Sequence, residues 1–242
     1  MNYALIFAGG VGSRMNSKAL PKQFLEINGK PIIIHTIEIF ERHPEIDAIC
    51  VACLSEWLDY LKKLLRKFNI EKVRWVVSGG ESALDSQYNG LAEIFGSGKC
   101  SDEDTVLIHD GVRPLINEAL ISECISTVKE KGSAVTVSPA IETIIKTNDN
   151  NEIVTTIPRS ECSLARAPQS FKFKNIFDAH NRSIKEGKRD FIDSASMMLY
   201  YGYSVCTVEG PAENIKVTTP SDFYLCRALL DARENLQVYG LQ

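Results

Sequence analysis

Long apolar runs are missing from this 242-residue chain, and no stretch approaches the roughly 20 residues that span a bilayer. A signal peptide is missing as well, because no charged segment followed by an apolar one opens the sequence. Positive charge is not in excess, since 27 Lys and Arg residues face 31 Asp and Glu residues and the net charge is −4. Such a chain lacks the basic surface typical of DNA- and RNA-binding proteins. We therefore expect a cytoplasmic protein that binds neither membrane nor nucleic acid.

Paired cysteines are also lacking. The seven cysteines are odd in number and irregularly spaced, which is typical of free thiols in a reducing compartment. Cys50 and Cys53 have the spacing of half a zinc or redox site, but they lie in an apolar segment, 47–54, that is typical of a buried strand. On a strand, residues three positions apart point to opposite faces. No second Cys/His pair follows, so we expect no metal role for these two.

The rest of the composition is that of an ordinary globular protein, 44% apolar and 24% charged. A chain of this length buries about 70% of the surface that its unfolded form exposes, so it needs no disulfides. No internal repeat, low-complexity tract or linker interrupts it. We therefore expect a single domain over residues 1–242.

Short apolar runs alternate with longer amphipathic stretches. The runs predict strands at 3–7, 47–54, 73–77, 105–109, 134–139, 205–208 and 215–217. The amphipathic stretches predict helices at 32–40, 57–68, 82–95, 116–131, 175–185 and 194–201, with a last helix from residue 220. This alternation indicates an α/β fold, a mostly parallel sheet with helices on both faces.

Residues 142–160 break this rhythm. Two short β-rich segments, 143–146 and 153–157, flank a turn at 148–151, a pattern that predicts a β-hairpin. A hairpin that projects from an α/β core does not bury both of its faces alone. We therefore expect this segment to be a β-arm for dimerisation.

The densest chemistry follows the first strand. Its loop consists of Ala8, Gly9, Gly10, Gly12 and Arg14, with Pro21-Lys22-Gln23 shortly after. Glycines at this place let backbone N–H groups approach a phosphate closely, and ligands of open α/β sheets bind at the carboxyl ends of strands. A Walker loop would end in Gly-Lys-Ser/Thr and a dinucleotide loop would have the spacing Gly-x-Gly-x-x-Gly; neither occurs here. The two cations suit a group that gains negative charge in the transition state.

Further blocks follow in order along the chain. They are Gly79-Gly80 with Asp85-Ser86, His109-Asp110-Gly111-Val112-Arg113-Pro114, Thr143, Arg159, Pro168-Gln169, Asp193 with Ala195-Ser196, and Asn214-Ile215-Lys216-Val217-Thr218. With these blocks nearly the whole chain resembles the cytidylyltransferases that act on polyol phosphates. The two best-known branches of that family use methylerythritol 4-phosphate, for isoprenoid biosynthesis, and ribitol 5-phosphate, for teichoic-acid and capsule biosynthesis.

The resemblance implies a Rossmann-like fold of the nucleotide-diphospho-sugar transferase type that forms a homodimer through a β-arm, and 142–160 falls where that arm belongs. It also implies that a polyol phosphate attacks the α-phosphorus of CTP and releases pyrophosphate. A phosphate monoester is largely dianionic near neutral pH, because its second pKa is about 6, so it needs no general base. Catalysis then comes from alignment and charge neutralisation.

The resemblance assigns roles to the cations and to the nucleotide-binding segments. Arg14 and Lys22 stabilise the α-phosphate, and Lys216 meets the substrate phosphate. The glycine loop, Gly80 and Ser86 bind the nucleotide. The alternative for Arg14 and Lys22 is a pair of solvated loop cations, and for Ser86 it is a helix-start residue that hydrogen-bonds the backbone.

Asp110 ends a buried strand, where a lone carboxylate is unstable unless it is paired or metal-bound. The resemblance makes it a ligand of Mg²⁺, which typically takes one or two carboxylates plus substrate phosphates. The alternative is an ion pair with Arg113. His109 points to the other face of the strand, and we expect it to be structural.

Three residues resemble substrate-binding positions. Thr143 and Arg159 match residues that reach from the arm of one subunit towards the polyol phosphate in the other. Asp193 matches an acceptor of hydrogen bonds from polyol hydroxyls. The alternative is that Asp193 only caps the helix beginning at Ser194.

Four positions depart from the commoner family pattern: Ala83, Ala167, Ile192 and Ser194. They affect the substrate contacts rather than the chemistry of CTP. The His109–Pro114 block is closer to the ribitol-phosphate branch. A sugar-phosphate or molybdopterin nucleotidylyltransferase shares the first loop but not the later blocks. A non-catalytic nucleotide-binding module is disfavoured by the retained cations and by Asp110.

Overall fold

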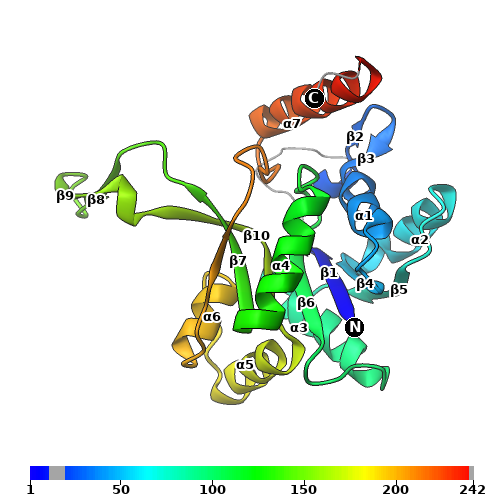
Figure 1. Cartoon of the computed structure of the whole chain (residues 1–242), viewed down its shortest axis with the longest axis horizontal. Helices are drawn as coiled ribbons and strands as arrows, with labels where there is room; N and C mark the ends of the chain where they lie inside the picture. The colour runs from blue at the N-terminus through cyan, green and yellow to red at the C-terminus, as the bar shows by residue number, and fades with distance from the viewer. Residues whose placement is uncertain (11–19, 240–242) are drawn as a thin grey trace.

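A seven-stranded sheet forms the centre of the molecule in the computed structural model, which describes residues 1–10 and 20–239, the last four as backbone only (Figure 1). The strand order is β11-β7-β10-β6-β1-β4-β5. The strands are β1 (Asn2–Ala8), β4 (Ala48–Cys53), β5 (Val73–Ser78), β6 (Thr105–Asp110), β7 (Ser133–Pro139), β10 (Ser163–Lys172) and β11 (Thr207–Glu209). Only β10 runs antiparallel to its neighbours. The prediction of a mostly parallel sheet is confirmed.

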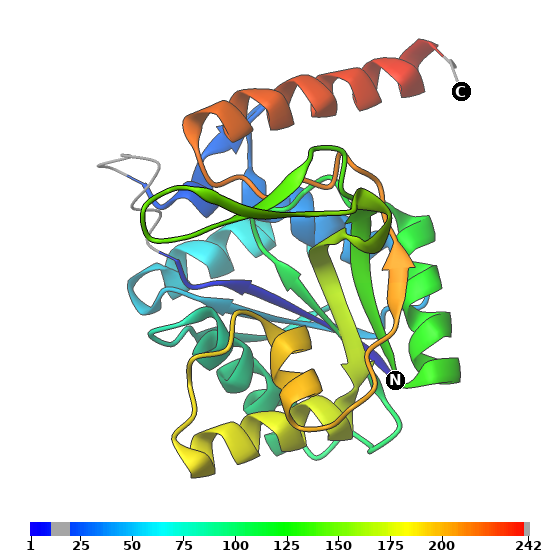
Figure 2. The same ribbon diagram turned by 90° about the vertical axis from the view of Figure 1, so that its left-hand side faces the viewer.

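Helices cover both faces of this sheet. They are α1 (Ile32–Arg42), α2 (Leu58–Lys67), α3 (Ala83–Gly96), α4 (Glu118–Lys131), α5 (Phe173–Glu186) and α6 (Ser194–Tyr200), whereas α7 (Pro220–Tyr239) packs in a separate apolar cluster. The apolar sides of α1, α2 and α4 pack on one face, and those of α3, α5 and α6 pack on the other (Figure 2). No helix in the described part of the chain is long and apolar enough to cross a membrane.

Strand β4 shows how the sheet separates two cores. All six of its residues are buried. Cys53 belongs to the core under α1 and α2, whereas Cys50 belongs to the core under α3 and α5. The two thiols therefore lie on opposite faces, as the strand interpretation predicts. Burial raises the pKa of the Cys53 thiol to about 12, which makes it an unreactive core residue.

Strand β10 is absent from the sequence prediction, although it lies between β6 and β7. Its sequence, Ser-Leu-Ala-Arg-Ala-Pro-Gln-Ser-Phe-Lys, contains a proline and few large apolar residues, so it has no strand-like alternation. The proline is tolerated because the pairing of β10 with β7 shifts register between Ala165 and Gln169. A bulge of this kind bends a strand and redirects its side chains.

The segment 215–217, predicted as a strand, is not one. Val217 donates its backbone N–H to the carbonyl oxygen of Val112 over 2.9 Å, but no ladder follows. Beyond it, Asp222 in the first turn of α7 accepts from the backbone of Thr218 and Thr219 over 2.9 and 2.7 Å. Helix α7 itself packs on the small hairpin of β2 (Glu26–Ile27) and β3 (Lys30–Pro31). The segment is thus held at both ends, which fixes the position of Lys216.

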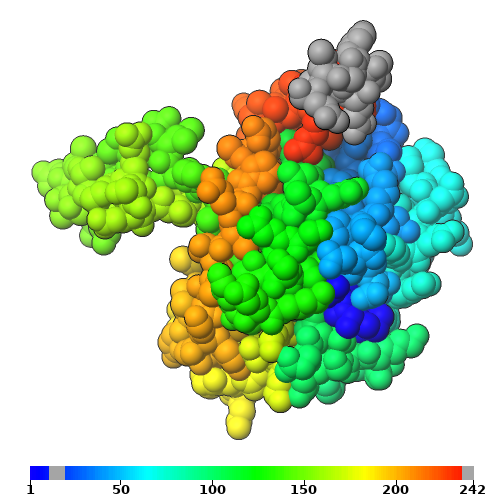
Figure 3. Space-filling view, in the orientation of Figure 1, coloured from blue at the N-terminus to red at the C-terminus, as the bar shows by residue number. Residues whose placement is uncertain are grey.

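The predicted hairpin is present and projects from the body of the molecule (Figures 1 and 3). It consists of β8 (Ile144–Thr147) and β9 (Ile153–Ile157), which pair antiparallel. Large apolar side chains on and beside it are exposed, among them Ile141, Ile145, Ile153, Val154 and Leu164. An arm with this much exposed apolar surface is typical of a segment that packs on another chain.

Candidate active site

The site lies where the parallel strands end. Ala8 is the last residue of β1 and Asp110 the last of β6, and the register pairs Asp110 with Phe7. Strand β5 ends beside them and leads directly into Gly79 and Gly80. In open α/β sheets this edge is the ligand-binding edge.

Two adjoining cavities open at this edge. The first, of about 220 Å³, is lined by Gly9, Gly10, Lys22 and Ser86. The second, of about 170 Å³, is lined by Arg166, Gln169 and Asp193. The residues common to both linings are Phe7, Ala83, Asp110 and Lys216. A larger cavity, of about 540 Å³, lies between α1 and α7, but no predicted site residue lines it.

Gly9, which lines the first cavity, and Gly80, which does not, are both close to helix α3. A Cβ atom on Gly9 would lie 2.6 Å from the Ser86 hydroxyl, and one on Gly80 would overlap Asp85. The Ser86 hydroxyl accepts from the backbone N–H of Gly80 over 3.0 Å and donates to the carbonyl oxygen of Ser82 over 2.9 Å. Ser86 therefore joins the two glycine segments of the nucleotide side.

Ser86 lies in the first turn of helix α3 and hydrogen-bonds the backbone, as the alternative predicts, but it is not the helix cap. The helix cap is Ser82, whose hydroxyl accepts from the backbone of Asp85 over 3.0 Å. The Asp85 carboxylate accepts in return from the backbone of Ser82 over 3.1 Å, which completes a capping box.

Lys22 is placed by its neighbour Gln23. Residues Lys22–Phe24 form one turn of 3₁₀ helix, and the buried Gln23 side chain donates to the carbonyl oxygen of Ala8 over 2.8 Å. This bond ties the turn to the end of β1, so Lys22 lines the first cavity. Arg14 and Gly12 lie outside the described residues, and their roles stay predictions.

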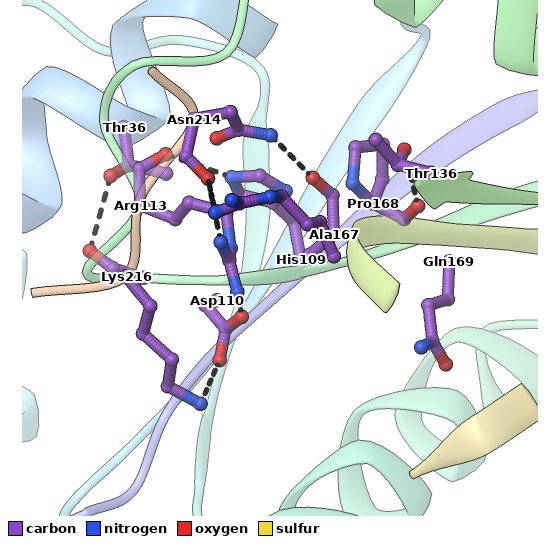
Figure 4. A network of polar contacts seen from close by, with 12 residues as sticks. Thr36, His109, Asp110, Arg113, Thr136, Ala167, Pro168, Gln169, Asn214 and Lys216 are labelled. Carbon is purple, nitrogen blue, oxygen red and sulfur yellow. Dashed lines mark hydrogen bonds and ion pairs between the residues drawn. The ribbon is translucent and has the colours of Figure 1, made fainter. Parts of the chain in front are cut away.

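Asp110 lies between two cations at the junction of the cavities (Figure 4). Its carboxylate is 3.2 Å from Nε of Arg113 and 2.6 Å from Nζ of Lys216. Burial alone would raise the pKa of Asp110, but the charges of Arg113 and Lys216 outweigh it, so the net pKa lies below its usual value. The predicted ion pair with Arg113 is present, and the carboxylate is ionised at neutral pH.

His109 faces away from the cavities and packs against the ring of Phe40. Its Nε2 donates to the carbonyl oxygen of Arg113 over 3.0 Å. Burial is the main reason that the pKa of His109 falls to about 4, so the ring is neutral. It supports the turn that carries Arg113, in agreement with the structural role predicted for it.

Asp193 has one of the two roles considered for its position, the helix cap, and its contact with polyol hydroxyls stays a prediction. Its Oδ1 accepts from the backbone of Ser196 over 2.8 Å, so it caps α6. It also lines the second cavity, where Gln169 donates to its Oδ2 over 2.8 Å. The other end of the Gln169 amide accepts from the backbone of Ala195 over 3.0 Å. The Pro168-Gln169 block thus fixes the carboxylate at the wall of the cavity.

Thr143 and Arg159 lie on the arm and line neither cavity of their own chain. Thr143 is exposed, and Arg159 donates to the carbonyl oxygen of Ile141 over 2.8 Å. Their predicted contact with a second subunit stays a prediction.

The departures from the family pattern gather around the second cavity. Ala83, Ala167, Ile192 and Ser194 all line the second cavity, whereas only Ala83 reaches the first. Sequence reasoning missed Arg166, which lines the same cavity. Arg166 lies in β10, a strand that the apolar pattern of the sequence did not predict, so no sequence feature identified Arg166 as a site residue.

The fold and site define a class. A glycine loop at the end of β1, a buried acid flanked by cations and two adjoining cavities are the parts of a nucleotidyltransferase. Residues 3–232 match the family described as "IspD: 2-C-methyl-D-erythritol 4-phosphate cytidylyltransferase". The chain belongs to this family and is a cytidylyltransferase.

Known relatives extend over the whole chain. A ribitol-5-phosphate cytidylyltransferase of Streptococcus agalactiae serotype III is 51% identical over 241 residues and covers 100% of both chains. One from Vibrio parahaemolyticus is 49% identical and covers 99% of this chain and 100% of the other. The solved 4-diphosphocytidyl-2C-methyl-D-erythritol synthase of Anaerococcus prevotii superposes with a TM-score of 0.80 at 25% identity, covering 95% of this chain and 96% of that one.

Proposed function

We propose that this enzyme transfers CMP from CTP to D-ribitol 5-phosphate. A phosphate oxygen of the acceptor attacks the α-phosphorus of CTP, the bond from that phosphorus to the β-phosphate oxygen breaks, and pyrophosphate leaves with CDP-ribitol as the other product. The observation that carries the proposal is the position of Asp110 and Lys216 where a glycine-lined cavity meets a second, polar one. The acceptor is chosen from the full-length relatives at 51% and 49% identity.

The nucleotide belongs in the first cavity in this proposal. Its phosphates lie against the backbone of the glycine loop, and Lys22 neutralises charge on the α-phosphate. The acceptor lies in the second cavity, with its hydroxyls towards Asp193. The two reactants then meet at Lys216, where alignment and charge neutralisation accelerate a reaction whose nucleophile needs no base.

Mg²⁺ fits the residues at the junction. Asp110 is ionised and faces both cavities, and one carboxylate together with substrate phosphates is a usual magnesium environment. We propose that Asp110 holds the ion. When bound, the metal supplies neutralisation of phosphate charge.

The setting of the reaction also belongs to the proposal. All seven cysteines are free, which suits a reducing compartment and supports a cytoplasmic location. The exposed apolar arm supports a homodimer in which each arm completes the site of the other subunit. A CDP-ribitol product supports a place in teichoic-acid or capsule biosynthesis.

A second acceptor is favoured by one observation. The family description and the solved Anaerococcus prevotii structure name 2-C-methyl-D-erythritol, although the latter is only 25% identical. This acceptor would place the enzyme in isoprenoid biosynthesis instead.

The test is pyrophosphate release by the purified protein with CTP, Mg²⁺ and each acceptor in turn. Release with ribitol 5-phosphate is the expected result. Release with methylerythritol 4-phosphate alone would transfer the proposal to the second acceptor. No release with either polyol phosphate would contradict an enzymatic role and favour a nucleotide-binding module.

A further inference from the structure

Arg166 is brought to the second cavity by the bulge in β10. The ladder with β7 is regular up to Ala165 and resumes at Gln169, so Arg166 lies in the irregular stretch between them. A bulge turns side chains away from the alternation of the strand. The partly buried Arg166 side chain consequently lines the cavity that also contains Asp193 and Lys216.

The guanidinium of Arg166 bonds only neutral groups in the described part of the chain. Its Nε donates to the Ser138 hydroxyl over 2.8 Å, and its Nη1 donates to the carbonyl oxygen of Asn214 over 3.2 Å. Arg113 donates to the same carbonyl oxygen over 2.7 Å. Two guanidinium groups therefore converge on one neutral acceptor, while no described carboxylate lies within ion-pair distance of Arg166.

The charges around this cavity are unbalanced. Arg113, Arg166 and Lys216 line it together, but Asp110 already bonds two of them. Asp193, the other carboxylate of the lining, accepts from the Gln169 side chain and from the backbone N–H of Ser196. Burial lowers the pKa of Arg166, and the charge of Arg113 lowers it further. An anion in the cavity would relieve both effects.

We propose that Arg166 binds the phosphate group of the acceptor in this enzyme, an inference that rests on the proposed function. Arg166 lines the acceptor cavity and not the glycine-lined one, so its ligand is the acceptor rather than CTP. The planar guanidinium binds phosphate oxygens in pairs, which holds the attacking group in one orientation. Its bonds to Ser138 and Asn214 fix the fork before the substrate arrives.

A purely structural role predicts something different. In that case Arg166 only joins β10 to β7 through Ser138, and Ser138→Ala would reproduce the effect of Arg166→Ala. Ser138→Ala is therefore the matched control, because it removes the same bond and leaves the charge in place.

The experiment measures KM for ribitol 5-phosphate, KM for CTP and kcat in both variants. For Arg166→Ala, we expect KM for the acceptor to rise about 10- to 100-fold, because the variant loses a charged hydrogen bond to the acceptor. KM for CTP and kcat should change less than about threefold, because the contact is made in the ground state and the transition state alike. Arg166→Lys should recover part of the loss.

Inorganic phosphate separates phosphate binding from hydroxyl binding. Its inhibition constant against the acceptor should rise in parallel with KM in Arg166→Ala. A rise in KM alone would overturn the assignment to phosphate. Equal effects of Ser138→Ala and Arg166→Ala, or an unchanged acceptor KM, would overturn the proposal altogether. A wild-type enzyme that releases no pyrophosphate would instead contradict the proposed function, so the two failures are distinguishable.

Discussion

Asp110 is the residue that joins the two halves of the site. It belongs to both cavities, and its carboxylate is bonded to one cation from its own turn and to one from the segment before α7. From the sequence, two roles were open for this carboxylate: a ligand of Mg²⁺ or a partner in an ion pair with Arg113. The ion pair is present, and it keeps the carboxylate charged.

Asp110→Asn removes this charge and keeps the shape. We expect pyrophosphate release to slow by about 100-fold or more, because electrostatic stabilisation at the reacting phosphate is lost. The magnesium concentration for half-maximal activity should rise. The free energy of unfolding should fall by about 3 kcal/mol, because the buried Arg113 loses its partner. Asp104→Asn is the control, because Asp104 lies at the opposite end of β6 and pairs with the N-terminus. It should leave the magnesium dependence unchanged. An unchanged magnesium dependence in Asp110→Asn would argue against a metal at this residue.

Lys22→Ala tests the cation of the glycine-lined cavity. In our proposal Lys22 stabilises charge that develops in the transition state, so we expect kcat to fall by about 100-fold or more. Lys62→Ala, an exposed lysine of α2 paired with Asp59, provides the comparison and should leave kcat unchanged. A Lys22→Ala enzyme with wild-type kcat would support the alternative of a solvated loop cation. Steady-state kinetics of pyrophosphate release decides between the two.

His180 makes stability depend on pH. It is buried beside Tyr88, its Nε2 has no hydrogen-bond partner in the described part of the chain, and burial lowers its pKa to about 4. In the unfolded chain a histidine has a pKa near 6.5, so the unfolded state binds more protons and stability is lost as pH falls from about 6.5 towards 4.

His180→Leu removes this penalty. From pH 7 to pH 5, the variant should gain about 2 kcal/mol of unfolding free energy relative to wild type. Urea unfolding at the two pH values measures the difference. Both proteins contain a second buried neutral histidine, His109, so its effect on stability cancels when the two are compared. A stability difference that is the same at both pH values would mean that His180 is not a buried neutral group.

At the scale of elements, prediction from sequence succeeded where the apolar period was clear. The helices with amphipathic period and the all-buried strands β4 and β6 were found near their observed bounds. The prediction failed at β10, whose burial comes from neighbours on both sides rather than from its own apolar pattern. It also failed at 215–217, where an apolar run is anchored by single bonds instead of a ladder. Both errors lie at the second cavity, and for that reason Arg166 was missed.

The arm is the element that the site depends on in our proposal. If Arg159 acts across a dimer, Arg159→Ala and Lys216→Ala homodimers should both be nearly inactive. A heterodimer with one copy of each, purified through two different tags, should recover about half of the wild-type activity, because one of its two symmetric sites keeps both residues.

A heterodimer as inactive as its parents would place both residues in the site of one chain and contradict the role of the arm. A monomer in light scattering of the wild type would contradict the dimer itself. These two results are independent, since a dimer can form without sharing residues between its sites.

At the scale of the whole molecule, a net charge of −4 conceals a local excess of cations. Lys22, Arg113, Arg166 and Lys216 come from four distant parts of the chain and meet at one edge of the sheet. Sequence motifs identified three of these four positions, because their neighbours form recognisable blocks. The fold brings them together since every parallel strand ends at that edge.

The most direct test of the account is a competition between acceptors. Equal concentrations of ribitol 5-phosphate and methylerythritol 4-phosphate are incubated with the enzyme, CTP and Mg²⁺, and both cytidine diphosphate products are quantified by mass spectrometry. The ratio of products equals the ratio of kcat/KM values. We predict that CDP-ribitol exceeds the methylerythritol product by at least about tenfold, the range that a few altered pocket contacts supply. An excess of the methylerythritol product, or formation of neither, would contradict the account.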